Sequence, residues 1–252
     1  MNNNTEIKVI PIFDLMKPPN CDGGFLAIDL SYGYSVNQNL LKFLQYDVLP
    51  DYLRILDRSR SIEHILDVCK NSLILAEDMG LNYDIAITAA VYHDIGLTFS
   101  YSYLFNNEHY YSSYESLKED EETLKELGLT EKQLQLIEIA ILEMCSNKKS
   151  SPYSTLLADA DKISELNPTY LIKKTSNHIV AMYTYKPINQ LVNRIYRSIY
   201  EKYGTEKSYG RIFFTPIGKH IRDRKIGNIA RIANDKEIFL SEFKNLIDKE
   251  NG

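Results

Sequence analysis

The chain has 252 residues, of which 44% are hydrophobic and 25% charged, and its formal net charge is −5. These fractions are typical of an ordinary globular protein, and the length suits one large domain or one and a half domains. No apolar run approaches the ~20 residues of a membrane span, and residues 1–6 lack the basic flank of a secretory signal. Cys21, Cys69 and Cys145 show no paired spacing, which argues against a disulfide framework and a zinc knuckle. Together these features predict a cytoplasmic protein that has no membrane partner.

The first 36 residues differ from the rest of the chain. Residues 7–13 and 25–30 look extended, and Pro18-Pro19 and Gly23-Gly24 interrupt the stretch between them. From about residue 37 onward, apolar residues follow helical spacing. This change predicts a short irregular N-terminal extension over residues 1–36.

Two consecutive helices are expected next. Ser61 can cap the first, and Gly80 lies where a helix often needs a left-handed C-terminal residue. Asn82 can start the second, which is expected to end at Gly96. Their apolar residues recur at intervals of three and four, so each helix presents one face to a core.

Further helix signals continue to the C-terminus. Thr130 and Gln133 form a capping box, and Pro152 follows a Ser/Lys-rich loop and opens another helix. Pro187 is well placed as a first helical residue, and two more helices are expected around residues 216–233 and 235–249. The chain is therefore expected to be all-α, with a helical core over residues 37–170 and additional C-terminal helices over residues 171–252.

Two histidines and two aspartates form a candidate metal-ligand set. His64 lies on the first of the paired helices, His93 and Asp94 lie near the end of the second, and Asp161 follows later. Imidazole and carboxylate ligands suit Mn²⁺, Fe²⁺, Co²⁺, Ni²⁺, Zn²⁺ or Mg²⁺ better than a thiophilic metal. Adjacent helix residues point about 100° apart, so His93 and Asp94 can share only an ion that lies close to the helix. Gly96 lets other groups approach there. A buried hydrogen-bonded pair that ends a helix is the alternative.

The order of these residues resembles the HD-domain superfamily of metal-dependent phosphohydrolases, whose ligands run His, then His-Asp, then a late Asp. The resemblance implies an HD-domain-like helical bundle and one divalent metal ion held by His64, His93, Asp94 and Asp161. From the residues alone, Asp159 competes with Asp161 for the last position. The resemblance favours Asp161, because the late ligand of the family lies in an Ala-Asp-basic-aliphatic run. Asp159 is then expected to be a supporting or capping carboxylate.

The chain also departs from the pattern of its HD relatives. The resemblance covers roughly residues 40–165 and is similar to one subgroup of small bacterial HD hydrolases. The His-His-x-x-Ser motif of that subgroup is Glu-His-Tyr-Tyr-Ser at residues 108–112, so only His109 remains. Met144, or Cys145 if the register differs by one, replaces a further His, and Arg60 replaces another. Because two-metal HD enzymes use the extra histidines to hold a second ion, we expect one metal.

The resemblance implies hydrolysis of a small phosphorylated substrate, such as a nucleotide, by attack of a metal-bound water. Asp94 or Glu108 is expected to take the proton of that water, and His109 to contact the substrate or transfer a proton. The alternative for His109 is a packing or surface histidine. Cationic side chains are expected to bind the phosphoryl oxygens, with plain solvated residues as the alternative; the candidates are Arg58, Arg60, Lys162, Arg194 and Arg197.

Tyrosines gather after the His-Asp motif, at positions 101, 103, 110, 111 and 114. They are candidates for one wall of a pocket that stacks on a base. The alternative is that they pack a connecting loop against the core.

The C-terminal half carries an excess of positive charge. Residues 173–231 contain 13 Lys and Arg against three acidic residues, Glu201, Glu206 and Asp223. Such a segment favours a small anionic substrate, and its dispersed charges disfavour nucleic acid; the alternative is a solvated helical face.

Two other functions stay open. A non-catalytic HD scaffold for ligand or partner binding is favoured by the missing histidines, and an HD-type di-iron oxygenase is disfavoured by Met144. The substrate and the oligomeric state stay open.

Overall fold

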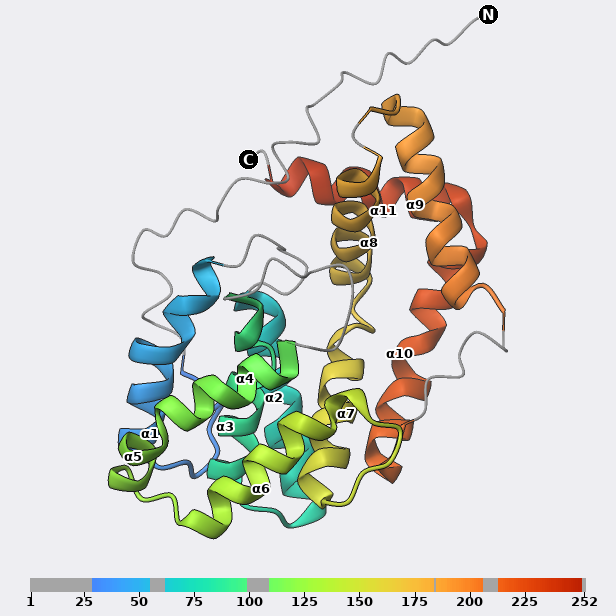
Figure 1. The fold of residues 1–252 in the computed structure, drawn as a ribbon. Helices are drawn as coiled ribbons and strands as arrows, with labels where there is room; N and C mark the ends of the chain where they lie inside the picture. The colour runs from blue at the N-terminus through green and yellow to red at the C-terminus, as the bar shows by residue number, and fades with distance from the viewer. Residues whose placement is uncertain (1–28, 55–61, 99–108, 184, 206–212, 251–252) are drawn as a thin grey trace, which may run out of the picture.

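The computed structural model describes residues 29–54, 62–98, 109–183, 185–205 and 213–250 (Figure 1). Within these ranges the regular elements are helices, labelled α1 to α11 with short 3₁₀ and π turns, and there is no strand. The all-α fold expected from the sequence is confirmed. The segments expected to be extended, residues 7–13 and most of 25–30, lie outside the described residues.

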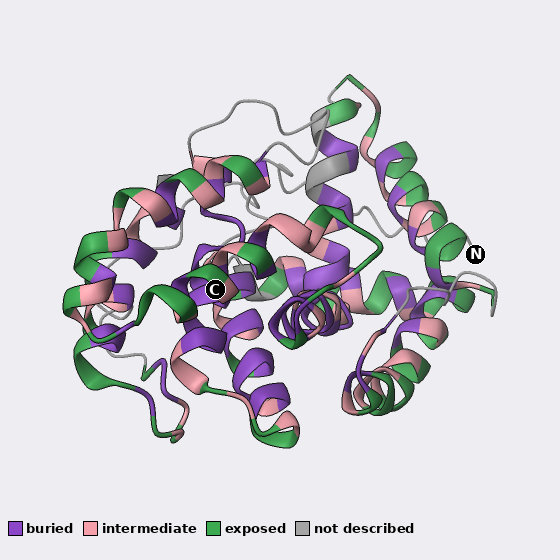
Figure 2. Ribbon diagram, turned by 60° about the horizontal axis from the view of Figure 1, so that its bottom comes forward, coloured by how far each residue is buried: buried purple, intermediate pink, exposed green. Residues whose placement is uncertain are grey.

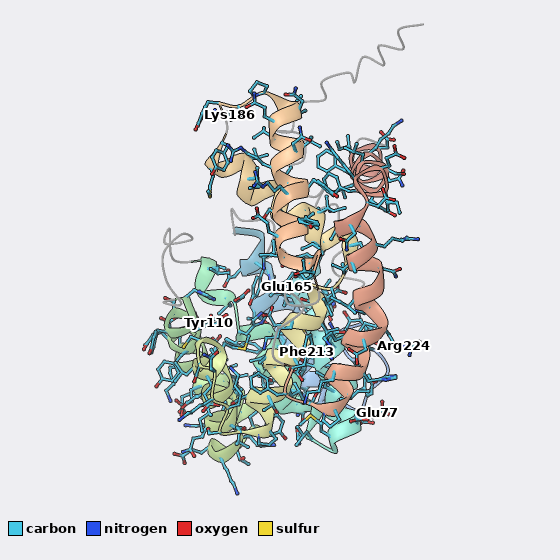
Figure 3. All side chains as sticks on the ribbon, turned by 90° about the vertical axis from the view of Figure 1, so that its right-hand side faces the viewer. Glu77, Tyr110, Glu165, Lys186, Phe213 and Arg224 are labelled. Atoms are coloured by element: carbon cyan, nitrogen blue, oxygen red, sulfur yellow. The ribbon has the colours of Figure 1, made fainter. Side chains whose placement is uncertain are left out.

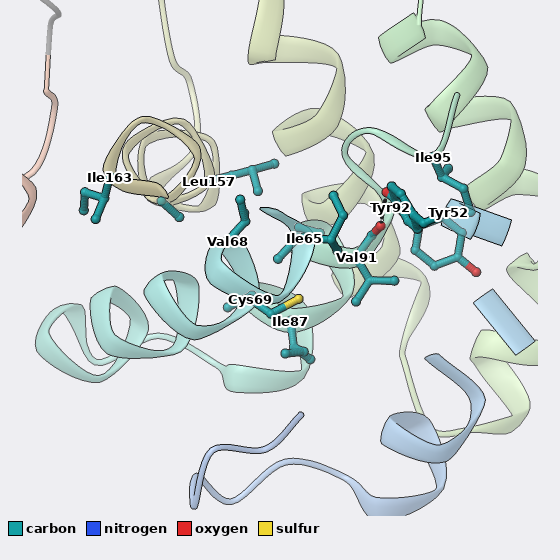
Figure 4. Packing of buried hydrophobic residues seen from close by; sticks show 14 of the residues in the cluster. Tyr52, Ile65, Val68, Cys69, Ile87, Val91, Tyr92, Ile95, Leu157 and Ile163 are labelled. Atoms are coloured by element: carbon teal, nitrogen blue, oxygen red, sulfur yellow. Dashed lines mark hydrogen bonds between the residues drawn. The ribbon is translucent and has the colours of Figure 1, made fainter. Parts of the chain in front are cut away.

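Helices α2 (Ile62–Met79), α3 (Tyr83–Tyr92) and α7 (Pro152–Ser164) form the centre of the molecule. Helix α2 packs against both of the others, and residues 85–92 of α3 are all buried. Figure 4 shows Ile65 of α2, Ile87 of α3 and Leu157 of α7 among the side chains of this core. Because these three helices come together, they can bring polar side chains from distant parts of the sequence to one place.

Shorter helices cover this centre. Helix α1 (Gln38–Phe43) continues into a π turn and a 3₁₀ turn that ends at Arg54. Helices α4 (His109–Glu119) and α6 (Glu131–Leu142) pack on α3 and on each other, with α5 (Glu121–Glu126) between them in sequence. Burial is therefore almost continuous in the inner helices and one-sided in the outer ones (Figure 2).

Local sequence signals predicted most helix starts. The Asn82 side chain caps α3, the capping box of Thr130 and Gln133 opens α6, and Pro152 is the first residue of α7. Pro187 is the N-cap of α9 and not its first helical residue, so that expectation was off by one position.

The expected end of the second paired helix was also wrong. Helix α3 ends at Tyr92, and Gly96 lies in a 3₁₀ turn, Ile95–Thr98. A Cβ on Gly96 would lie 2.1 Å from the His109 carbonyl oxygen and 2.6 Å from the Ser113 nitrogen. Gly96 therefore allows the close approach of α4, as expected from its missing side chain.

The C-terminal region consists of four helices: α8 (Pro168–Met182), α9 (Ile188–Tyr203), α10 (Pro216–Asn234) and α11 (Lys236–Glu250). They pack mainly on one another, and α10 also contacts α2 and α7 (Figure 3). The division expected at residue 170 falls inside α8 and stays a prediction.

None of the described helices is long and apolar enough to cross a membrane. Among the described cysteines, Cys69 is buried and Cys145 exposed, and both are free thiols.

Candidate metal centre

His64, His93, Asp94 and Asp161 lie together where α2, the end of α3 and α7 meet. The His64 Nε2 atom lies 3.3 Å from Asp161 Oδ1 and 3.7 Å from Asp94 Oδ2. The His93 Nε2 atom lies 3.5 Å from Asp94 Oδ2 and 4.0 Å from Asp161 Oδ1. One candidate ligand atom each from His64, His93 and Asp161 lies within 4.8 Å of the others. Both ring nitrogens thus lie close to carboxylate oxygens of Asp94 and Asp161.

Hydrogen bonds on the far side of each imidazole orient the two rings. The Nδ1 atom of His93 lies 2.7 Å from the Ala90 carbonyl oxygen, and the Nδ1 atom of His64 lies 3.0 Å from Ser164 Oγ. Ser164 in turn donates to the Asp161 carbonyl oxygen at 2.6 Å. These partners assign the proton of each neutral ring to Nδ1 and leave a lone pair on Nε2.

The Nε2 atom of His93 is buried and has no hydrogen-bond partner within the described part of the chain. Buried polar atoms in proteins are nearly always paired, so such an atom calls for an explanation. A metal ion bonded to Nε2 supplies one. The residues present therefore fit a divalent ion with nitrogen and oxygen ligands.

Burial and neighbouring groups also favour the protonation states that bind metal. Burial lowers the pKa of His93, which keeps the ring neutral at physiological pH. Burial alone would raise the pKa of Asp161, but the nearby imidazoles of His64 and His93 outweigh it and lower the pKa overall. An ionised carboxylate and a neutral imidazole are the forms that bind a cation.

His109, at the start of α4, is buried beside this cluster. Its Nε2 atom lies 3.2 Å from Asp94 Oδ1, on the carboxylate oxygen that does not face His64 and His93. The Ser113 hydroxyl accepts from the Gly96 N–H at 2.9 Å and donates to the His93 carbonyl oxygen at 3.0 Å. These bonds hold α4 against the end of α3, and His109 is a partner of Asp94.

The other residues expected at the site lie in different places. Arg58, Arg60 and Glu108 are outside the described residues. Lys162 follows Asp161 on α7, and its Nζ atom lies 4.7 Å from the centre of the Phe214 ring. The structure does not bring the two arginines of α9 to the cluster. Arg194 lies over the Tyr183 ring, and Arg197, 80% exposed, pairs with Glu201 on its own helix.

Asp159, the other candidate for the late ligand, faces a different element. Its Oδ1 atom accepts from the Phe214 N–H at 2.9 Å, and its Oδ2 atom accepts from the Thr215 N–H and hydroxyl, each at 2.7 Å. Because two residues on a helix diverge, Asp161 points to the cluster and Asp159 to the segment that precedes α10.

A pocket of about 330 Å³ adjoins the cluster, with Asp161 in its wall. Six of its lining side chains matter here: Tyr110, Met144, Lys149, Asp161, Lys162 and Phe214. The tyrosine-rich stretch after the His-Asp motif had indicated Tyr110. The comparison with HD relatives had indicated Met144, as a residue that replaces a histidine. Lys149 and Phe214 were missed, because one lies in an ordinary Ser/Lys-rich loop and no motif surrounds the other.

Residues 61–166 match the family model described as the HD domain. The match spans α2 to α7 and includes all four residues of the cluster, and it confirms the resemblance stated from the motifs. Members of this family bind divalent metals and belong to a superfamily of metal-dependent phosphohydrolases.

An uncharacterized protein of Clostridium beijerinckii is 33% identical to this chain over 108 residues. The similarity covers 42% of this chain and 65% of that relative, which is less than two thirds of its length. No solved structure matches the chain.

Proposed function

We propose that this protein is a metal-dependent phosphohydrolase that acts on a small phosphorylated substrate, with nucleotides among the candidates. The observation that carries the proposal is the buried Nε2 atom of His93, which has no hydrogen-bond partner among the described residues and faces the carboxylates of Asp94 and Asp161. A hydrogen-bonded core pair would leave no such atom without a partner.

His64, His93, Asp94 and Asp161 would hold the ion. A divalent ion there would polarise a phosphoryl oxygen and lower the pKa of a water. The residues around it have separate tasks. Ser164 and the Ala90 carbonyl keep the two imidazoles oriented, and both imidazoles are buried.

His109 and Asp94 form a pair that can hold and move a proton. The proton would lie between His109 Nε2 and Asp94 Oδ1, which are 3.2 Å apart, a distance suited to a hydrogen bond. In this proposal Asp94 both binds the ion and accepts a proton, and His109 transfers that proton onward.

The pocket beside Asp161 would receive the substrate. Its volume of about 330 Å³ is at the small end of ligand sites, which suits a small molecule and not a polymer. Lys162 would face the phosphoryl oxygens, as expected from its place beside Asp161.

We also propose that the site holds one ion. Met144 lines the pocket, and its thioether is a poor ligand for a hard ion, so a second ion would lack a ligand there.

Metal analysis of the purified full chain, together with a phosphate-release screen over nucleotides and sugar phosphates, tests these proposals. We expect one ion per chain and phosphate release that a chelator abolishes. His93→Ala should lose both, whereas His220→Ala, at an exposed position on α10, should keep both.

Other results would contradict the proposal in distinguishable ways. One tightly bound ion without any turnover would support a non-catalytic HD scaffold. Two ions per chain and consumption of oxygen would support an oxygenase. Full phosphate release in the absence of metal would exclude the cluster as the reaction centre.

A further inference from the structure

The ring of Tyr170 lies nearly parallel to the imidazole of His64. The two ring centres are 5.2 Å apart, and the angle between the ring planes is 10°. An offset stack of this kind is one of the favourable arrangements of two aromatic rings. Tyr170 is buried on α8, beyond the segment 61–166 that matches the HD domain. The C-terminal region therefore contacts a proposed metal ligand directly.

The stacked ring restricts a torsion of His64 that rotamer preferences leave loose. Rotation of a histidine ring about its Cβ–Cγ bond has broad preferences, so packing must fix the plane of the ring. The hydrogen bond between Ser164 and His64 Nδ1 acts at a single atom of that ring. Tyr170 covers a face, and the His93 ring meets it edge-on at 5.6 Å between ring centres. Together these contacts keep His64 Nε2 directed to Asp161.

The turn between α7 and α8 holds Tyr170 in this place. Asn167 is the N-cap of α8, and its side chain accepts from the Tyr170 N–H at 3.4 Å. Lys174, one turn further along α8, pairs with Glu165 at 2.5 Å, and its Nζ atom lies 5.8 Å from the centre of the Tyr170 ring. Glu165 lies at the junction of the two helices and directly follows Ser164 (Figure 3). The same turn therefore positions both the hydroxyl and the aromatic face that contact the imidazole.

We propose that Tyr170 is a positioning residue of the metal centre, whose ring holds the His64 imidazole in the plane that directs Nε2 towards the ion. This inference rests on the proposed function, because it takes His64 as a metal ligand. It gives α8 a part in the metal centre, although α8 lies outside the segment that matches the HD domain.

The affinity of the purified full chain for Co²⁺, measured by competition with a chelator, tests the inference. Tyr170→Leu keeps an apolar side chain but removes the aromatic face, and it should weaken Co²⁺ binding about threefold to tenfold, the range expected for the loss of one aromatic pair. Tyr170→Phe keeps the ring and should bind Co²⁺ like the native chain. An equal loss of affinity in Tyr170→Phe would show that the hydroxyl acts on the site and not the stacked face, which would overturn the inference.

Phe239→Leu is the matched control for a general loss of stability. Phe239 is a fully buried aromatic residue of the same C-terminal region, but its ring partners are Tyr196 and Phe243. Both leucine variants should lower the free energy of unfolding, whereas only Tyr170→Leu should weaken Co²⁺ binding to the folded protein. Equal Co²⁺ affinities in the two variants would leave Tyr170 with a packing role alone.

NMR of the histidine rings checks the geometry in the absence of metal and substrate. The ring current of a stacked tyrosine shifts the carbon-bound protons of an imidazole upfield, so the His64 signals should move downfield in Tyr170→Leu and change little in Tyr170→Phe. The chain has five histidines, and His64→Gln identifies the His64 signals by their loss. His220, which is exposed on α10, should keep its signals in every variant. Unmoved His64 signals in Tyr170→Leu would mean that the rings are not stacked in solution.

The metal measurements also separate this inference from the proposed function. Co²⁺ binding that weakens in Tyr170→Leu, in a protein that releases no phosphate from any substrate, would support the role of Tyr170 and contradict the hydrolase. Native-like Co²⁺ affinity in Tyr170→Leu, in a protein that hydrolyses phosphoesters, would overturn the role of Tyr170 alone. A native chain that binds no metal would overturn both.

Discussion

Helices α3 and α9 bury their side chains in different ways. In α3 every residue from 85 to 92 is buried, because α2, α4, α6 and α7 all pack against it. In α9 the buried residues form one stripe, Leu191, Ile195, Ile199 and Tyr203. A polar atom in the first environment must find a partner or a ligand, whereas one in the second can face water. The buried nitrogen of His93 is therefore informative, and the exposed cations of α9 are not.

The two regions are nevertheless joined at the site. Asp159 is the fully buried carboxylate of α7 that binds the segment before α10. Through this contact the C-terminal region supplies Phe214 to a pocket whose other lining residues lie in the segment that matches the HD domain model. The difference in burial predicts that substitutions in the inner helices have larger effects than matched substitutions in the C-terminal helices.

The largest effect is expected for Asp94→Ala. The change removes one proposed ligand and the partner of His109, so the affinity for metal should fall about 100-fold or more, and phosphate release with it. Helical content should be nearly unchanged, because the fold rests on apolar packing. Metal analysis, phosphate release and circular dichroism measure the three quantities.

The matched control is Asp223→Ala on α10, where the side chain is 62% exposed. That variant should bind metal and turn over like the native chain. Normal turnover by Asp94→Ala with metal still bound would show that Asp94 is not a ligand.

Alanine substitutions at two glycines, one beside the inner helices and one in the C-terminal helices, compare how the two regions affect the free energy of unfolding. Gly96→Ala places a methyl group against the backbone of His109 and Ser113, and we expect the free energy of unfolding to fall by about 3 kcal/mol. Gly227→Ala, on α10, should raise it by up to about 1 kcal/mol, because beyond the local helix backbone no atom of the described residues lies within 4 Å of the new methyl group. Urea unfolding of both variants measures the difference. Equal small changes would show that the close approach at Gly96 relaxes easily.

Ser164→Ala tests whether the orientation of His64 matters. The hydroxyl connects His64 Nδ1 to the Asp161 carbonyl oxygen, so its loss should weaken metal binding about tenfold. Ser176→Ala on α8 is the control, since this serine is equally buried and its hydroxyl has no hydrogen-bond partner within the described ranges. Competition with a chelator measures both affinities. An equal metal affinity in the two variants would contradict the role of Ser164.

The smallest effect is expected at the surface. Glu121 pairs with Lys118 and Lys125, and hydrogen bonds from these lysines lower its pKa to about 2. A lowered pKa in the folded state stabilises the protein above the unfolded-state value, about 4.5, and this contribution disappears as the pH falls towards 2. Glu121→Gln should therefore be slightly less stable than the native chain at pH 7 and equally stable near pH 2.

Urea midpoints at both pH values, at low and high salt, check this expectation. Glu201→Gln, which removes a single exposed contact with Arg197, should show a smaller difference at pH 7. A larger loss of stability in Glu121→Gln near pH 2 than at pH 7 would reverse the predicted sign.

The sequence by itself determined several helices and their starts, because these depend on short-range signals. The cap at Asn82, the capping box at Thr130 and the proline at 152 act over three or four residues, and the structure has them where the pattern placed them. The motif order also pointed to His64, His93, Asp94 and Asp161, and the structure brings these four together.

Only the tertiary structure decided which other groups meet them. That Asp159 faces Phe214, 55 residues further along the chain, depends on how α10 docks on α7, which no local pattern encodes. The same holds for His109 beside Asp94 and for Lys149 beside Lys162, whereas Arg194 and Arg197 lie on an outer face. Charge and spacing are properties of a segment, but a binding site depends on contacts between segments, and those form when the helices bury their apolar faces together.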